Sequence, residues 1–176
     1  MIPIKQNAMS KKVKILNTVE IQQKLNRLAY QVYENNYDES SLLIAGIEGN
    51  GFKMAGMLAE KLKQISSLKI VLGKISLDKE EPWKKEAKTD FNEKDFANKT
   101  VILVDDVLNS GKTLIYAVKL FLDKPVRKLN TVVLVDRSYK RYPVKADYVG
   151  LSLSTTLQDR IEADFSKKGS EAVYLV

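Results

Sequence analysis

Two adjacent carboxylates and a run of small polar residues stand close together near the middle of the sequence. Asp105 and Asp106 come directly after a short apolar stretch, and residues 109–113 follow just before a helical pattern begins. Backbone N–H groups in such a turn, with the positive end of the helix dipole, can bind one phosphate group, and the hydroxyls of Ser110 and Thr113 add donors. Paired carboxylates suit a diol or a metal ion. The pattern predicts a site for a phosphorylated sugar, although the same residues could also simply cap a turn and start a helix.

A second glycine turn follows another apolar stretch. Residues 41–47 have the composition of a fully buried strand, and the turn 48–51, which contains Gly49 and Asn50, precedes a second helical pattern. In a parallel sheet, ligands bind beyond the carboxyl ends of the strands, so this turn is the second place to expect a site. By itself it is as readily an ordinary tight turn.

Neither turn matches a common nucleotide-binding motif. A nucleoside triphosphate loop ending in the Gly-Lys-Thr of residues 111–113 requires glycine where Asp106 stands. The dinucleotide fingerprint requires glycine or alanine where the sequence has Met54. The first motif is excluded, and a nicotinamide-dependent enzyme is a weak alternative.

The sequence contains no cysteine and no histidine. It therefore lacks the residues for disulfides, for thiolate or histidine zinc sites, for Ser-His-Asp and Cys-His triads and for imidazole acid–base chemistry. Asp, Glu, Lys, Arg, Tyr and the backbone amides are the remaining catalytic groups. The formal net charge of +7 fits an anionic ligand such as a phosphate ester or RNA, and it fits a well-solvated surface equally well.

The elements that must position these residues alternate between strands and helices. Spacings of three and four between apolar residues predict helices over 19–33, 54–62 and 114–122, the first with Asn17 or Thr18 as N-cap. Apolar runs predict strands at 41–47, 68–77, 100–104, 129–135, 147–153 and 172–176, and residues 78–98 are expected to be mostly loop with one helical turn. This alternation predicts an α/β fold with a doubly wound, largely parallel sheet flanked by helices.

The chain of 176 residues has the length and composition of one compact domain, so residues 1–176 are expected to fold as a single domain. The apolar stretches are shorter than the roughly 18 residues of a membrane span, so no membrane association is expected. Residues 1–14 lack the apolar core and cleavage site of a secretory signal, and the expected location is the cytoplasm.

The stretch 101–113, VILVDDVLNSGKT, resembles the signature of the type I phosphoribosyltransferases, in which a hydrophobic strand leads into paired acids and a Thr/Ser-Gly-x-Thr phosphate turn. The resemblance extends to residues 43–47, 135–137 and 146–150, and it is greatest to the bifunctional branch that regulates pyrimidine operons and has uracil phosphoribosyltransferase activity. It implies transfer of a phosphoribosyl group from 5-phosphoribosyl-1-pyrophosphate (PRPP) to a nitrogen base, here a pyrimidine such as uracil. It also implies a homodimer or a larger assembly.

The resemblance implies a role for each part of the site. Asp105 and Asp106 would be the catalytic acids that hold the ribose hydroxyls, directly or through Mg²⁺. The turn 48–51, with Gly49 and Asn50, would bind the pyrophosphate. The 5′-phosphate would be bound by Asn109, Ser110, Gly111, Lys112 and Thr113.

Two further segments take roles from the same resemblance. The region 137–150 would form a small hood subregion over the base, with Arg137 in it and Val149 packed on the base ring. Residues 78–98 would be the mobile loop that closes over the reacting groups and excludes water.

This sequence departs from the family pattern at both turns. The regulator-like branch has Lys and Arg where this chain has Glu48 and Asn50, and a carboxylate facing pyrophosphate is repulsive unless it points away or binds Mg²⁺. Lys53 is the nearest basic residue along the chain that could compensate. Purine-salvage relatives carry a proton-accepting acid at the position of Asn109, which cannot take a proton. A pyrimidine acceptor is therefore expected rather than hypoxanthine or guanine.

A second function is open on the sequence alone. Arg137, Lys140, Arg141 and Lys145 are interleaved with two tyrosines, a composition that can stack on and neutralise single-stranded RNA. The same composition occurs on solvated surfaces. The alternative is a regulator with the same fold that senses a nucleotide, binds RNA and has weak or no catalysis.

Overall fold

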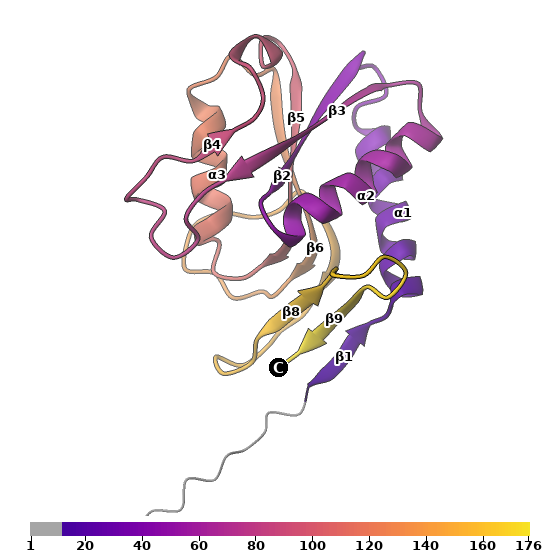
Figure 1. The fold of residues 1–176 in the computed structure, drawn as a ribbon, viewed down its shortest axis with the longest axis vertical. Helices are drawn as coiled ribbons and strands as arrows, with labels where there is room; N and C mark the ends of the chain where they lie inside the picture. Colours follow the sequence, from indigo (N-terminus) through magenta and orange to yellow (C-terminus); the bar gives the residue numbers. More distant parts are fainter. Residues whose placement is uncertain (1–11) are drawn as a thin grey trace, which may run out of the picture.

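The computed structural model describes residues 12–176 (Figure 1). Its main element is a six-stranded sheet in the order β4-β3-β2-β5-β6-β7. Neighbouring strands are parallel except β3 and β4, which are antiparallel. The predicted α/β class with a largely parallel sheet is confirmed. The strands of this sheet are β2 (Ser41–Ile47), β3 (Lys69–Ser76), β4 (Lys88–Thr89), β5 (Thr100–Leu108), β6 (Lys128–Asp136) and β7 (Tyr148–Ser152).

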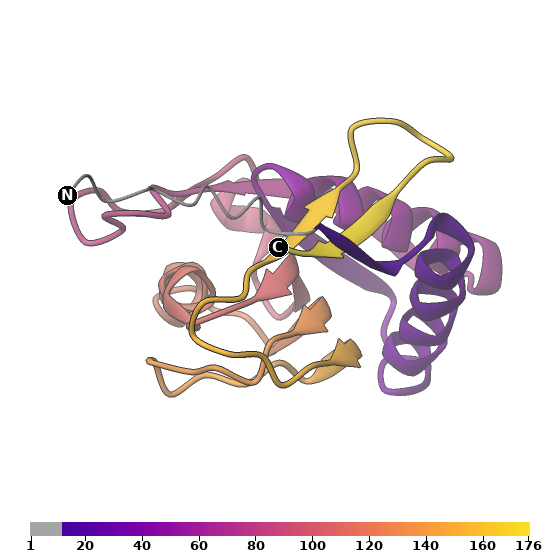
Figure 2. The ribbon, with the colours of Figure 1, turned by 90° about the horizontal axis from the view of Figure 1, so that it is seen from below.

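Helices cover both faces of the sheet. α1 (Thr18–Glu34) and α2 (Asn50–Ile65) pack on one face and α3 (Lys112–Leu122) on the other (Figures 1 and 2). Each face has its own buried apolar cluster, with Leu25 of α1 in one and Phe121 of α3 in the other. The sheet is therefore doubly wound, as predicted. Within the described residues, none of the helices is long and apolar enough to cross a bilayer.

The start of α1 shows how local sequence determines an element. The Asn17 side chain accepts a hydrogen bond from the Glu20 N–H at 2.9 Å, and the Glu20 carboxylate accepts one from the Asn17 N–H at 2.8 Å. This reciprocal pair satisfies two N–H groups that the first helical turn leaves without partners. Of the two N-caps that the sequence allowed, the structure uses Asn17.

β5 extends beyond the apolar run that predicted it. It ends at Leu108 rather than at position 104, and Asp105 pairs in register with Val133 of β6. Asp105 and Asp106 therefore lie inside the strand and not after it. Only residues 109–111 separate β5 from α3, which begins at Lys112. The short connection holds the aspartates and the helix N-terminus close to one another.

A smaller antiparallel sheet lies at the carboxyl ends of the parallel strands (Figure 1). In order across the sheet, it consists of β1 (Val13–Leu16), β9 (Ala172–Leu175) and β8 (Ile161–Asp164). Ile161 and Val173 are buried in the cluster beside α1 and α2, which anchors this sheet to the main body. The sequence predicted the strand at 172–176 but not β1 or β8, because each has only four residues and no apolar run of its own.

The segment between β3 and β5 is mostly irregular, as predicted. It contains β4 and one turn of 3₁₀ helix, η1 (Glu93–Asp95). The Phe96 ring is buried against Phe121 of α3, with centroids 5.7 Å apart. This contact anchors the second half of the segment, while residues 78–87 lie closer to the carboxyl edge of the sheet.

Candidate functional site

The turns that follow β2 and β5 lie side by side, because these strands are neighbours in the sheet. A Cβ placed on Gly51 would lie 2.8 Å from Oδ1 of Asp105 and 3.2 Å from its Cα. The first turn of α2 therefore packs directly on the aspartate, which only glycine allows. The structure brings together three predicted parts of the site: the paired aspartates, the turn 48–51 and the turn 109–113.

Asp105 is the most unusual ionisable group at this edge. The residue is 5% exposed, and its Oδ1 accepts a hydrogen bond from the Asp106 N–H at 3.0 Å. Burial raises the pKa of Asp105 well above its ordinary value, the charge of Asp106 raises it further, and the charge of Lys79 acts in the opposite direction. A buried carboxyl group of this kind gains from a hydroxyl donor or a cation brought to it by a ligand.

The paired aspartates fit a magnesium ion that is bound mainly by a substrate. Among residues 12–176, no group of three or more His, Cys, Asp or Glu side chains could hold a metal ion alone. Mg²⁺ commonly keeps several waters and takes one or two carboxylates together with substrate phosphate oxygens. Buried Asp105 and half-buried Asp106 are a suitable donor set for that arrangement.

The turn 109–113 leaves amide donors at the start of α3. Gly111 is the N-cap with a φ of 87° and has no side chain to cap the helix, while the Ser110 hydroxyl accepts a hydrogen bond from the Lys112 N–H at 3.4 Å. The Ser110 carbonyl accepts hydrogen bonds from the N–H groups of Arg141 and Tyr142 at 2.9 and 3.1 Å, which hold the turn from behind. Uncapped N–H groups at a helix N-terminus are a ready anion site. A recess of about 40 Å³ at this point is lined by all five predicted residues, Asn109, Ser110, Gly111, Lys112 and Thr113.

The turn 48–51 is also a helix start with a positive φ, 93° at Gly49, and again α2 receives no side-chain cap from residues 12–176. Glu48 does not face into the turn. Its carboxylate accepts a hydrogen bond from Lys74 of β3 at 3.1 Å, and the bonds from Lys74 and then Ser76 lower the pKa of Glu48. The repulsion that a carboxylate at this position would exert on pyrophosphate is reduced, because the charge is paired on β3.

The two polar side chains Asn50 and Lys53, at the start of α2, do not replace the basic residues that the family pattern has in this turn. The Asn50 side chain donates to the Ala163 carbonyl of β8 at 2.8 Å, so it ties α2 to the small sheet and only its backbone N–H remains at the turn. Lys53 lines a different cavity, of about 670 Å³, between α1, α2 and the turn that joins β8 to β9. The compensating role suggested by its position in the sequence is not supported.

Lys79, which the sequence analysis placed only within the loop 78–98, lies beside the turn instead. Nζ of Lys79 is 4.0 Å from the position that a Cβ on Gly49 would occupy. Burial has the largest effect on the pKa of Asp105, and the hydrogen bond from Lys74 has the largest effect on the pKa of Glu48. The positive charge of Lys79 has a smaller effect and lowers the pKa of both groups. Hydropathy could not reveal this lysine, because its approach depends on how residues 78–87 fold back across the sheet edge.

Arg137 and Val149 both make contacts within the protein, and their predicted roles at the base stay predictions. Arg137 is 8% exposed, and its guanidinium donates to the Thr155 hydroxyl at 2.6 Å and to the Thr156 carbonyl at 2.7 Å. Val149 lies within β7 and packs on the apolar cluster beside α3. β7 pairs with β6 in the main sheet, and the small antiparallel sheet also lies at the carboxyl edge.

The basic segment 137–145 is partly engaged with the protein itself. Arg137 is buried, and Lys140 forms an ion pair with Asp136. The Arg141 guanidinium lies 5.7 Å from the centroid of the Tyr139 ring. Lys140, Arg141 and Lys145 are nevertheless exposed, so the RNA-binding role of this segment stays a prediction.

Comparisons with known proteins agree with this geometry. The phosphoribosyl transferase domain model matches residues 13–166. The chain is similar to Bifunctional protein PyrR of Streptococcus uberis, with 32% identity over 173 residues, 94% of this chain and 98% of that protein. It is also similar to Bifunctional protein PyrR of Streptococcus mutans, with 34% identity over 150 residues, 84% of this chain and 85% of that protein.

Solved structures show the same fold. The hypoxanthine phosphoribosyltransferase of Trypanosoma cruzi has a TM-score of 0.75 at 15% identity, covering 93% of this chain and 95% of that one. A hypoxanthine-guanine phosphoribosyltransferase of Bacillus anthracis has a TM-score of 0.73 at 18% identity, covering 93% and 97%. Since the family match includes both turns and the paired aspartates, the chain belongs to the type I phosphoribosyltransferase family and resembles the PyrR proteins within it.

Proposed function

We propose that this protein transfers the phosphoribosyl group of PRPP to a pyrimidine base such as uracil, in a Mg²⁺-dependent reaction that releases pyrophosphate. The observation that carries the proposal is the packing of Gly51 on buried Asp105, because it sets the carboxylates between two helix N-termini. PRPP has a matching order of groups: a 5′-phosphate, a diol and a diphosphate.

Each part of the site has a distinct task in this proposal. The turn 109–113 binds the 5′-phosphate through backbone N–H groups and the dipole of α3. Asp105 and Asp106 accept hydrogen bonds from the ribose hydroxyls, which favour the ionised form of Asp105. The resulting negative charge stabilises the positive charge that develops on the ribose as its bond to the diphosphate breaks. Mg²⁺, when bound, would be held by Asp105 and Asp106 and would neutralise the diphosphate leaving group.

Two features support a pyrimidine acceptor. Asn109 is exposed at the edge of the phosphate recess and has no group that could take a proton from a purine nitrogen. The chain is also 32% identical to a PyrR protein but only 15% identical to the hypoxanthine phosphoribosyltransferase that shares its fold.

The test is incubation of the protein with PRPP, Mg²⁺ and an equimolar mixture of nucleobases, followed by mass spectrometry of the products. The expected result is one new nucleotide, a pyrimidine monophosphate. Replacing both acids, as Asp105→Asn with Asp106→Asn, should lower turnover about 1000-fold or more, because the developing charge loses its stabilising carboxylates.

Asp123→Asn is the matched control, since it removes one carboxylate from the exposed end of α3, away from the site. It should leave turnover unchanged. A purine monophosphate would overturn the pyrimidine assignment, full turnover in the double variant would overturn the roles of the aspartates, and the absence of any nucleotide from the folded wild-type protein would overturn the transferase reaction itself.

A further inference from the structure

Residues 78–83 leave β3 with a tight turn that presents Lys79. Oδ1 of Asp78 accepts hydrogen bonds from the N–H groups of Glu80 and Glu81 at 2.9 and 3.0 Å. The bonds from Glu81 and Glu80 lower the pKa of Asp78, so the carboxylate that forms this turn is charged at neutral pH. The backbone on either side of Lys79 is thus fixed by local hydrogen bonds.

The turn is attached to the phosphate recess through Lys112. Nζ of Lys112, in the first turn of α3, donates a hydrogen bond to the Glu80 carbonyl at 2.8 Å. The same ammonium lies 5.8 Å from the centroid of the Trp83 ring. A side chain that begins beside the 5′-phosphate recess therefore holds the residue that follows Lys79.

Lys79 has the position and charge expected of a residue that binds an anionic substrate. Its Nζ lies beside Gly49, 4.0 Å from the position of a Cβ on that residue. No carboxylate among residues 12–176 lies within ion-pair distance of Lys79, whereas the nearby Lys74 is paired with Glu48. The turn 48–51 itself has no basic residue, so Lys79 is the cation that the fold adds to it.

We propose that Lys79 binds the diphosphate of PRPP at the Gly49 turn and that Lys112 is a positioning residue that holds Lys79 there. The inference rests on the proposed function and assigns the source of positive charge that the turn lacks. It connects the two ends of the substrate: the turn that binds the 5′-phosphate also holds the segment that binds the leaving group.

The experiment is isothermal titration of the full chain with three ligands in the presence of Mg²⁺: PRPP, inorganic pyrophosphate and ribose 5-phosphate. Ribose 5-phosphate lacks the diphosphate, so it reports on the turn 109–113 without Lys79. Lys79→Gln should weaken PRPP and pyrophosphate about tenfold and leave ribose 5-phosphate unchanged, because one charge-assisted contact is lost. Lys79→Arg should restore much of the affinity.

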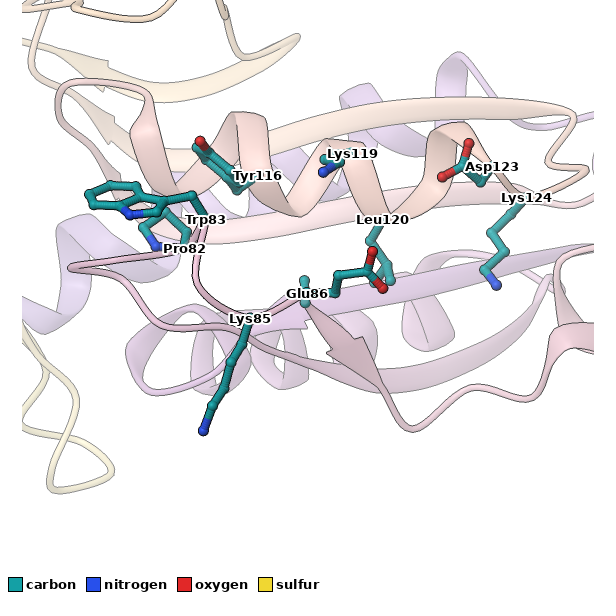
Figure 3. A pocket seen from close by; sticks show the side chains of 10 residues that line it. Pro82, Trp83, Lys85, Glu86, Tyr116, Lys119, Leu120, Asp123 and Lys124 are labelled. Atoms are coloured by element: carbon teal, nitrogen blue, oxygen red, sulfur yellow. The ribbon is translucent and has the colours of Figure 1, made fainter.

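Lys85→Gln is the matched control. Lys85 belongs to the same segment, and its side chain extends away from α3 at the cavity of about 150 Å³ that Trp83 and Tyr116 also line (Figure 3). This variant removes the same charge from the segment without touching the Gly49 turn. It should bind all three ligands as the wild type does, which excludes a general effect of net charge.

Lys112→Gln tests the positioning role. It should weaken PRPP about threefold more than it weakens ribose 5-phosphate, since the additional loss is in the placement of Lys79 and not in the phosphate turn. Trp83 is the only tryptophan in the sequence and is 58% exposed, so its fluorescence reports on the segment directly. The emission should change in Lys112→Gln and return with Lys112→Arg, while circular dichroism stays that of the wild type.

The outcomes separate this inference from the proposed function. If the wild type binds neither PRPP nor ribose 5-phosphate, the proposed function fails. If the wild type binds both and Lys79→Gln matches Lys85→Gln on all three ligands, the role of Lys79 is overturned while the proposed function stands. Equal losses for PRPP and ribose 5-phosphate in Lys112→Gln would show that Lys112 contacts the 5′-phosphate and would overturn its positioning role.

Discussion

Turn 48–51 and turn 109–113 have the same local architecture. Each follows a buried parallel strand and begins a helix at a glycine with positive φ, 93° at Gly49 and 87° at Gly111. At both helices the glycine N-cap has no side chain to bond the first N–H groups, although at α3 the Ser110 hydroxyl accepts a bond from the Lys112 N–H at 3.4 Å. Both turns therefore present amide donors at the carboxyl edge of the sheet.

They differ in how the rest of the binding groups are supplied. Turn 109–113 carries two hydroxyls of its own and is adjacent in sequence to the paired aspartates. In turn 48–51 the Glu48 carboxylate pairs with Lys74 of β3, and the Asn50 side chain donates to β8. The cation beside this turn, Lys79, belongs to another segment of the chain. The comparison teaches that one site combines a turn recognisable from sequence with a turn completed only by tertiary contacts.

Gly111→Ala should break the self-contained turn and have the largest effect. A Cβ there would lie 2.5 Å from Cγ1 of Val144, and the φ of 87° is strained for any side chain. Ribose 5-phosphate affinity should fall about 100-fold, measured by isothermal titration, because the amides of the turn are displaced. Gly169→Ala is the control: its φ is 83°, but within the described structure nothing lies within 4 Å of the added Cβ. Unchanged affinity in Gly111→Ala would contradict the assignment of this turn.

Gly51→Ala tests the other turn, 48–51, and should have the second-largest effect. The added Cβ would meet Oδ1 of Asp105 at 2.8 Å, so the first turn of α2 and the aspartate must separate. Turnover per PRPP bound should fall about tenfold, measured by steady-state kinetics, because reacting groups lose their alignment. Gly56→Ala, where the nearest atom lies at 4.0 Å, should instead stabilise α2 by about 0.5 to 1 kcal/mol. Equal kinetics in the two variants would show that close packing on Asp105 is unimportant.

Replacing Asp105, which lies between the turns, is expected to have the smallest effect of the three changes. The effect is on the stability of the protein. Its pKa is raised by burial and by Asp106, so the native state holds a proton that the unfolded state has lost above about pH 4. Stability from this group is therefore lost as pH rises from there to the raised pKa. Asp105→Asn should melt about 3 °C higher than the wild type at pH 8 and match it below pH 4, in thermal unfolding followed by circular dichroism. A variant that melts lower at pH 8 would show that the ionised carboxylate is well solvated or paired.

The sequence was sufficient where the determinants lie within a few consecutive residues. The N-cap of the first helix, narrowed to Asn17 or Thr18, the buried strand 41–47 and the ordered run of aspartates and small residues at 105–113 are all local patterns. Steric and hydrogen-bonding rules act on such patterns directly, so fold class and the centre of the site followed from them. The end of β5 was misplaced because two carboxylates do not resemble strand residues, although pairing with β6 continues through them.

Only the tertiary structure decided which groups complete the site. Lys112 reaches Glu80 across 32 positions of the chain and Asn50 reaches Ala163 across 113, and neither contact leaves a periodic signal. The same holds for Arg137, whose guanidinium donates to Thr155 and Thr156, and for the small sheet, which lies at the carboxyl edge. Composition and spacing determined the strands, helices and phosphate turn because those depend on neighbours in sequence. The position of Lys79 and the cover over the site depend on neighbours in space, which the packing of the whole chain sets.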